Sequence, residues 1–201
     1  MCNDYAREIE VGRVIKLTKE LDDMPPLQWR GGRIPNDAGP TPHIKIREKG
    51  VIARLDGGKL AAEMMTWAWK APTGKPVFNF VSEKRDFSTS NRCLILATGF
   101  YEYTTPEKPK VKLKDQHFFQ LKGVEWFWIA GIVKQDCFTM LTVNPGPDIR
   151  PYHDRQICVL PPAEGMHWLK LDKPEAGLLR QLPRGTLQVQ TLRRNGELLN
   201  G

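Results

Sequence analysis

The feature that most constrains the fold is that apolar residues gather in short runs of β-strand length. The clearest case is three successive segments, residues 117–121, 126–133 and 137–143, which are rich in Phe, Trp, Ile and Val and have Gly123 and Asp136 at their turns. β-Branched and aromatic residues favour strands, and turn residues at this spacing favour antiparallel neighbours. The sequence therefore predicts a largely antiparallel sheet.

Further strands are predicted along the rest of the chain. Apolar and polar residues alternate in residues 43–47 and 51–55, which predicts two antiparallel strands, and Gly57 and Gly58 follow as a turn signal. The remaining predicted strands are residues 59–69, 92–97, 100–103, 157–160 and 186–192.

Helical periodicity is rarer than strand periodicity. Apolar residues at loosely helical spacing predict one short amphipathic helix within residues 6–22, and short helices are also expected at residues 163–169 and 175–182. Gly and Pro predict a flexible linker at about residues 24–42, and the chain is expected to fray at residues 193–201.

Size and charge limit the class of protein. A chain of 201 residues that is 40% hydrophobic can bury one core, so we expect a single α+β domain over residues 1–201. The net charge of +7 comes from 30 Lys and Arg against 23 Asp and Glu. Such a charge favours a polyanionic partner such as DNA or RNA, although many proteins are this basic without binding one.

The cysteines and the apolar runs argue against several other classes. Cys2, Cys93, Cys137 and Cys158 show no CxxC and no paired spacing, which indicates neither a zinc site nor a disulfide framework. Reduced thiols in the cytoplasm are expected instead, with no metal and no cofactor. The N-terminus is acidic and polar, and no apolar run approaches about 18 residues, so no signal peptide or membrane span is predicted.

The amino terminus offers an unusual reactive group. A small residue at position two is what methionine aminopeptidase tolerates, and removal of Met1 would expose Cys2 as a 1,2-aminothiol. Its α-amino group has an ordinary pKa of about 8 and its thiol one of about 8.5, so either can attack an electrophile while the other assists. The alternative is an incidental thiol on a frayed end.

Four polar residues stand where packing or a turn is expected: Asn79, Glu102, His153 and Arg155. Each has a plain structural alternative, namely a strand end, an exposed strand face or a local ion pair in a turn. Together with an N-terminal Cys they supply a proton acceptor, a donor and an orienting amide, which the addition of an amine or thiol to a carbonyl requires.

Trp67 and Trp69 end the strand predicted at residues 59–69. Aromatic rings in such a place either pack in the core or form a platform on which DNA bases stack. Both alternatives stay open from the sequence.

The polar set lies in segments that resemble the SRAP (SOS response-associated peptidase) family. The resemblance covers nearly the whole chain and rests on Met1-Cys2, on Asn79 opening a segment like the family's Asn-Ala-Arg-Ala-Glu, on residues 92–95 (Arg-Cys-Leu-Ile) running to residues 99–102 (Gly-Phe-Tyr-Glu), and on His153-Asp154-Arg155. It implies a compact α+β domain built on largely antiparallel, barrel-like sheets with a few short flanking helices.

The resemblance also implies a function and roles for single residues. Members of the family sense abasic sites in single-stranded DNA. The matching positions imply Cys2 as covalent nucleophile, Asn79 as orienting hydrogen-bond partner, Glu102 as proton shuttle, His153 as general acid and Arg155 as a contact to the DNA backbone. Asn3, Trp67 and Trp69 are the further candidates for DNA contact. In this interpretation the protein is a cytoplasmic monomer that joins the nucleoid when it binds DNA.

The chemistry implied is a covalent DNA–protein crosslink. The open form of an abasic deoxyribose is an aldehyde, with which the α-amine of Cys2 can form an imine that the thiol then closes to a thiazolidine. One family feature is missing, because Val81 stands where the family has Arg, and with it one expected phosphate contact.

Two other classes of function remain open. An N-terminal Cys that uses its own amine as base is also found in self-processing amidohydrolases, so a peptidase is the enzyme alternative. A non-covalent reader of modified DNA is the binding alternative, in which Trp67, Trp69 and the basic surface bind and Cys2 is idle.

Overall fold

The computed structural model describes residues 2–199, and these form a strand-rich domain with three short α-helices. The fold class expected from the sequence, an α+β domain of largely antiparallel, barrel-like sheets, is confirmed. Met1 and residues 200–201 lie outside the described part of the chain.

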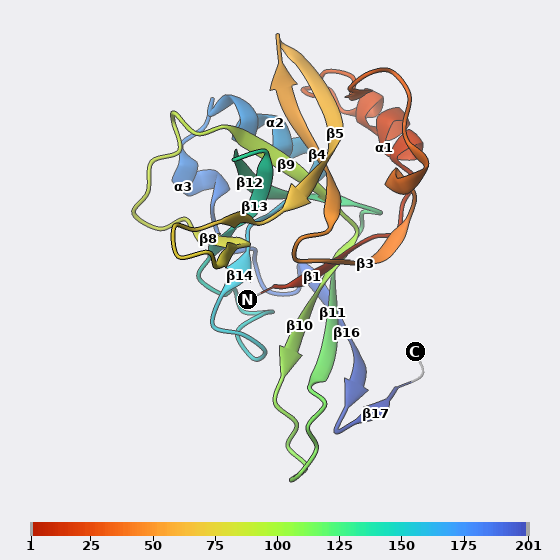
Figure 1. Ribbon diagram of the computed structural model, residues 1–201, viewed down its shortest axis with the longest axis vertical. Coiled ribbons are helices and arrows are strands. Elements are labelled where there is room, and N and C mark those ends of the chain that lie inside the picture. Colours follow the sequence, from red (N-terminus) through yellow and green to blue (C-terminus); the bar gives the residue numbers. More distant parts are fainter. Residues whose placement is uncertain (1, 200–201) are drawn as a thin grey trace.

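The first sheet contains the N-terminal strand and the long hairpin at the bottom of Figure 1. Its strands are β1 (Asp4–Arg7), β3 (Thr41–Lys45), β10 (Gly99–Thr104), β11 (Asp115–Leu121), β16 (Leu187–Arg194) and β17 (Glu197–Leu198). They pair in the order β17-β16-β11-β10-β1-β3, and each pairing is antiparallel.

The second sheet forms the barrel. Its strands are β2 (Gln28–Trp29), β4 (Lys49–Asp56), β5 (Lys59–Trp67), β8 (Asn79–Val81), β9 (Arg92–Ala97), β12 (Phe127–Lys134), β13 (Cys137–Val143), β14 (Gln156–Ile157) and β15 (Val159–Leu160). The order β13-β12-β9-β4-β5 is closed by a parallel pairing of β13 with β5, so these five strands form a ring. β8 also pairs parallel to β13, on the side of the ring that faces the amino terminus.

Short elements cover the rest. They are β6 (Trp69–Lys70) and β7 (Pro76–Val77), the helices α1 (Val11–Leu17), α2 (Gly165–Lys170) and α3 (Glu175–Leu178), and the 3₁₀ turns η1 (Thr18–Glu20), η2 (Asn36–Ala38) and η3 (Pro162–Glu164). α1 lies at the right of Figure 1, whereas α2 and α3 lie at the left. None of the helices in the described chain is long and apolar enough to cross a membrane.

The core has two parts because successive side chains of a strand point to opposite faces. On β9, Cys93, Ile95 and Ala97 belong to one buried cluster, which includes Cys2, whereas Leu94 and Leu96 belong to the other. The second cluster is covered by α2, whose buried Trp168 donates a hydrogen bond of 3.1 Å from its ring nitrogen to the Cys93 carbonyl.

The N-terminal region differs from its prediction. The helix expected within residues 6–22 is confined to Val11–Leu17, since residues 4–7 are strand β1. Tyr5 pairs with Phe100 and Ala6 pairs with Gly99, and Tyr5 and Ala6 are both fully buried. Tertiary pairing therefore overrides the local helical spacing.

Three other segments also differ. The strand predicted at residues 43–47 starts earlier, at Thr41, and pairs with β1 instead of with β4, its neighbour in sequence. The segment at 24–42 is not only a linker, because it contains β2 and η2 and buries Met24, Leu27 and Ala38. Likewise β16 and β17 form a hairpin through most of residues 193–199, where fraying was expected.

Candidate active site

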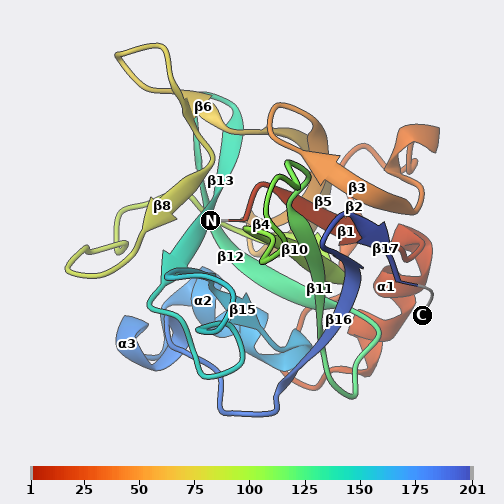
Figure 2. The ribbon, with the colours of Figure 1, turned by 90° about the horizontal axis from the view of Figure 1, so that it is seen from below.

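Cys2 lies two residues before the start of β1, and β1 is held between β3 and β10. Seen from below, the amino terminus sits near the middle of the face, between β8 on one side and β10 on the other (Figure 2). The Cys2 side chain is 1% exposed. The residue expected to react is thus packed in the core next to the sheet, which argues against the frayed-end alternative.

Asn79 holds the main chain of Cys2. Its side-chain amide nitrogen donates a hydrogen bond of 2.7 Å to the Cys2 carbonyl oxygen. Asn79 is the first residue of β8 and is paired with Met140 of β13, so the amide is presented from a fixed backbone. Its Oδ1 is buried and has no hydrogen-bond partner among the described residues, which leaves one acceptor beside the amino terminus.

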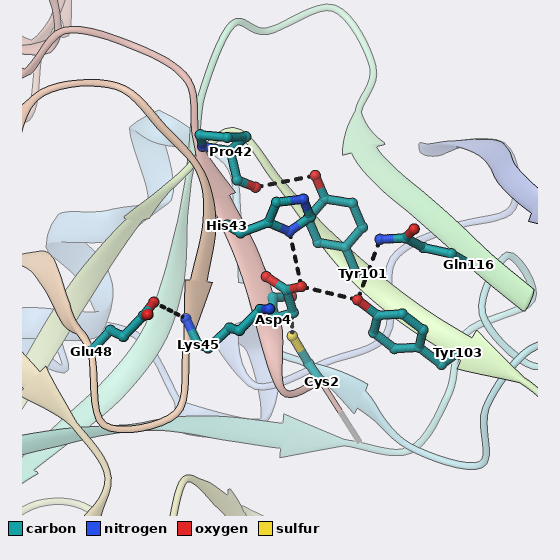
Figure 3. A network of polar contacts seen from close by, with 9 residues as sticks. All are labelled: Cys2, Asp4, Pro42, His43, Lys45, Glu48, Tyr101, Tyr103 and Gln116. Atoms are coloured by element: carbon teal, nitrogen blue, oxygen red, sulfur yellow. Dashed lines mark hydrogen bonds and ion pairs between the residues drawn. The ribbon is translucent and has the colours of Figure 1, made fainter. Parts of the chain in front are cut away.

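The Cys2 thiol is held in its protonated form. Sγ donates a hydrogen bond of 3.2 Å to the main-chain oxygen of Asp4 (Figure 3). Burial raises the pKa of the thiol well above its ordinary value, and the negative charges of Glu102 and Asp4 raise it further. Because thiolate is scarce at neutral pH, the thiol is poorly prepared to attack first.

Glu102 is the carboxyl group best placed to move protons. It lies in β10 and is 2% exposed. Burial raises its pKa from an ordinary 4.5 to about 7. A carboxyl with such a pKa can both take and return a proton near neutral pH.

His153 lies on the loop between β13 and β14. Its Nδ1 is 3.0 Å from the Arg155 backbone N–H and 2.8 Å from Asp154 Oδ1. Nδ1 cannot make both contacts in one protonation state. It accepts the Arg155 hydrogen bond only when it is unprotonated, and it can donate to Asp154 only when it is protonated. Burial is the main cause that lowers the pKa of His153, which favours the neutral ring that accepts from Arg155. A neutral ring is a hydrogen-bond donor through Nε2 rather than a strong general acid.

Arg155 is committed to an internal ion pair. It binds Glu83 with two hydrogen bonds of 2.9 and 2.6 Å and also donates to Asn144 and to the Thr142 carbonyl. The Arg155 side chain is 18% exposed. This geometry makes Arg155 a support for the His153 loop, and a DNA phosphate would have to compete with Glu83 for it.

The two tryptophans pack in the interior. Trp67 is fully buried, lies edge-on to Tyr5 at a ring distance of 5.4 Å, and donates a hydrogen bond to the Phe78 carbonyl. Trp69 is 6% exposed. The structure therefore favours packing over base stacking for both rings. Asn3, in contrast, is exposed next to Cys2.

The sequence did not point to the polar network around Asp4 (Figure 3). Asp4 Oδ2 accepts hydrogen bonds from Tyr103 Oη at 2.9 Å and lies 3.0 Å from His43 Nδ1. The Asp4 side chain is buried, which raises its pKa. The sequence signal was a carboxylate two residues after Cys2, but its partners come from β3 and β10 and could not be paired with it beforehand.

Taken together, the structure places Cys2, Asn79 and Glu102 in one electrostatic and hydrogen-bonded group. An anchored main chain, a buried thiol and a carboxyl that titrates near pH 7 can support addition of an amine to an aldehyde, followed by ring closure. All four cysteines are free thiols, so Cys2 is not engaged in a disulfide.

Comparison with known proteins relates the chain to one family. Residues 51–195 match the sequence profile of the family described as SOS response associated peptidase (SRAP). A curated relative, the abasic site processing protein YobE of Bacillus subtilis, is 28% identical over 100 residues. That match covers 46% of this chain and 45% of YobE, so it spans less than half of the relative.

Solved structures share the fold. A phage-related protein of Bordetella bronchiseptica superposes with a TM-score of 0.69 at 18% identity, covering 99% of this chain and 100% of the other. A protein of Bacteroides thetaiotaomicron gives a TM-score of 0.67 at 15% identity, with 96% and 92% covered. At these identities the likeness establishes the fold alone.

Proposed function

Since the chain belongs to the SRAP family, we propose that it recognises abasic sites in single-stranded DNA and bonds to them covalently through Cys2 after removal of Met1. The observation that carries the proposal is the anchoring of Cys2 by Asn79 beside Glu102, a carboxyl whose pKa is about 7. The name of the relative YobE, an abasic site processing protein, fits the same substrate.

The amine acts first. An abasic deoxyribose opens to an aldehyde, and the unprotonated α-amine of Cys2 adds to its C1′ carbon. Water then leaves, and a carbon–nitrogen double bond forms. Glu102 takes a proton from the ammonium group and returns one to the departing hydroxyl, which a carboxyl of this pKa can do in either direction.

The thiol then closes the ring. Sγ adds to the imine carbon, the thiol proton is transferred to the imine nitrogen, and the nitrogen becomes a secondary amine in a five-membered thiazolidine. The crosslink as a whole releases one water. Amine and thiol belong to one residue that Asn79 holds in place, so ring closure has the high effective molarity of an intramolecular step, about 10⁵ M or more in model reactions.

The protonation state of the Cys2 thiol disfavours the peptidase alternative. A cysteine peptidase attacks with a thiolate, whereas burial raises the pKa of the Cys2 thiol. The non-covalent reader is disfavoured too, because Trp67 and Trp69, its base-stacking candidates, are buried.

DNA binding rests on the positive charge of the chain, +7 overall. We expect preference for single-stranded over duplex DNA and binding that weakens as salt rises, because Lys and Arg displace counterions from phosphates. Equal affinity for intact duplex, or no dependence on salt, would contradict this part of the proposal.

The experiment compares wild type with Cys2→Ala and Cys137→Ala on a single-stranded oligonucleotide that carries one abasic site. Cys137 is a free thiol in β13 that has no part in the proposed chemistry, so its replacement is the matched control. On a denaturing gel, wild type and Cys137→Ala should give a heat-stable crosslink and Cys2→Ala should give none. A stable crosslink from Cys2→Ala would overturn the proposal.

A further inference from the structure

A cavity of about 510 Å³ opens beside the amino terminus, and none of its lining residues belongs to the proposed chemistry of Cys2. It is lined by Asn3, Asp4, Lys45, Ile46, Tyr103 and Lys114. The residues come from β1, β3, β10 and the chain before β11, and Figure 3 shows three of them, Asp4, Lys45 and Tyr103, side by side. Its size lies within the range of ligand pockets, about 300–1,000 Å³.

Two lysines from different elements give the cavity its charge. Lys45 is the last residue of β3, and Lys114 directly precedes β11. Both are exposed, and neither ammonium forms an ion pair with a carboxylate among residues 2–199. Unpaired lysines on facing elements are suited to an anion.

The same lysines lie within electrostatic reach of the site. The pKa of His153 is lowered chiefly by burial, and the Lys114 ammonium contributes to the lowering. The Lys45 ammonium likewise acts on the pKa of Asp4 against the larger, raising effect of burial. Both lysines are therefore close enough to act electrostatically on groups around Cys2.

Asp4 is the one carboxyl among the lining residues, and it opposes an anion only weakly. Its Oδ2 is already engaged within the protein, because it accepts a hydrogen bond from Tyr103 Oη and lies 3.0 Å from His43 Nδ1. The remaining lining groups are the Asn3 amide, the Tyr103 hydroxyl and the Ile46 side chain. Cationic, polar and apolar groups together match the phosphate, sugar and base of a nucleotide.

We propose that this cavity holds the nucleotide that adjoins the abasic one, with Lys45 and Lys114 on its phosphate and Asn3 on its sugar or base. The inference rests on the proposed function. Asn3, which lines the cavity, is bonded to Cys2, so a nucleotide in the cavity would neighbour the abasic sugar at Cys2. It makes the two lysines determinants of how the strand is placed, beyond general attraction to DNA.

The test measures binding without the covalent step. The probes are single-stranded oligonucleotides with a tetrahydrofuran abasic analogue, which has no aldehyde, placed internally, at the 5′ end or at the 3′ end. The proteins are wild type, Lys45→Ala, Lys114→Ala, the double variant and Lys59→Ala. Lys59 is exposed on the β4–β5 hairpin, whose tip lies at the top of Figure 1, away from β1 and β10, and it controls for loss of charge alone.

The double variant should bind the internal probe about tenfold more weakly, and the slope of log affinity against log salt should fall by about 0.7, the value for one phosphate contact to a single strand. Each terminal probe lacks a nucleotide on one side of the abasic analogue. On the probe that lacks the neighbour for this cavity, wild type and the double variant should bind with equal affinity. Lys59→Ala should stay within about twofold of wild type.

Three results would overturn the inference. The double variant could lose no more DNA affinity than Lys59→Ala, it could bind both terminal probes more weakly than wild type, or wild type could fail to bind the probes at all. Failure of the proposed function is distinguishable, because it is the absence of a crosslink to a natural abasic site while binding to the analogue persists.

Discussion

The side-chain amide of Asn79 donates a 2.7 Å hydrogen bond to the main-chain carbonyl of Cys2, and so ties β8 of the barrel to the segment that leads into β1. The bond joins two segments far apart in the sequence. It fixes the main chain of Cys2 without touching the thiol, so in the proposed reaction both the amine and the thiol stay available to the aldehyde.

Asn79→Ala should slow crosslinking by about fivefold, because loss of one neutral hydrogen bond costs about 1 kcal/mol. Asn79→Asp should be slower still, since a carboxylate would face the Cys2 carbonyl oxygen. Single-turnover crosslinking rates measure both, with thermal unfolding as the control for folding. An unchanged rate in Asn79→Asp would show that the amide has no orienting role.

Glu102→Gln should slow crosslinking by about 10²-fold while giving the same adduct mass, because it removes the proton carrier and keeps the shape. For wild type the rate should rise as pH increases through about 7, where Glu102 loses its proton. A wild-type rate that stays flat from pH 6 to 8 would contradict this role.

Ionisation of the buried Glu102 carboxyl should also destabilise the fold at high pH. Its pKa is raised on folding, so the unfolded chain releases the proton at about 4.5 and the folded chain at about 7. Stability is full below the lower value and falls between the two, by about 3 kcal/mol. Glu102→Gln mimics the neutral acid and should melt higher than wild type at pH 8 but not at pH 4. If the melting temperatures of the two proteins differed by the same amount at pH 4 and at pH 8, the assignment would be refuted.

Glu83→Gln should destabilise the fold by about 2 kcal/mol at pH 7, because Glu83 accepts two charge-assisted hydrogen bonds from Arg155. The Arg155 guanidinium lowers the pKa of Glu83. The stabilisation is therefore present above the ordinary pKa of the carboxyl and is lost as pH falls through the lowered one. Chemical unfolding at pH 7 and pH 3 checks this, and a difference between the proteins that is as large at pH 3 would contradict it.

An N-terminal extension that cells do not remove should abolish the stable adduct although the thiol is intact, because an amide nitrogen cannot form an imine. Cys2→Ala keeps the amine and should give only a hydrolysable Schiff base, which borohydride traps. Denaturing gels with and without borohydride measure both. A heat-stable crosslink from the extended protein would rule out the thiazolidine and leave a simple thiol.

The sequence predicted the strands better than their partners. Short apolar runs bounded by turn residues located most strands within residues 92–143, because this signal is local in the chain. It could not show that Tyr5 pairs with Phe100, since that contact depends on the closed sheet. For the same reason the spacing in residues 6–22 overestimated the helix.

The candidate site residues were named from the sequence, whereas their contacts were not predictable from it. The resemblance singled out Asn79 and Glu102, and the structure adds what they meet. It could not tell that Arg155 pairs with Glu83 or that Asp4 meets His43 and Tyr103, because such partners are chosen by tertiary packing. An aromatic strand end looks the same whether buried or exposed, so Trp67 needed the fold to be placed.

The intact mass of the protein after incubation with a single-stranded oligonucleotide carrying a natural abasic site tests the central claim most directly. The account predicts a species equal to the chain starting at Cys2 plus the oligonucleotide minus one water, and no such species from Cys2→Ala. An adduct on a chain that still carries Met1, or no adduct at all from a chain that begins at Cys2, would contradict it.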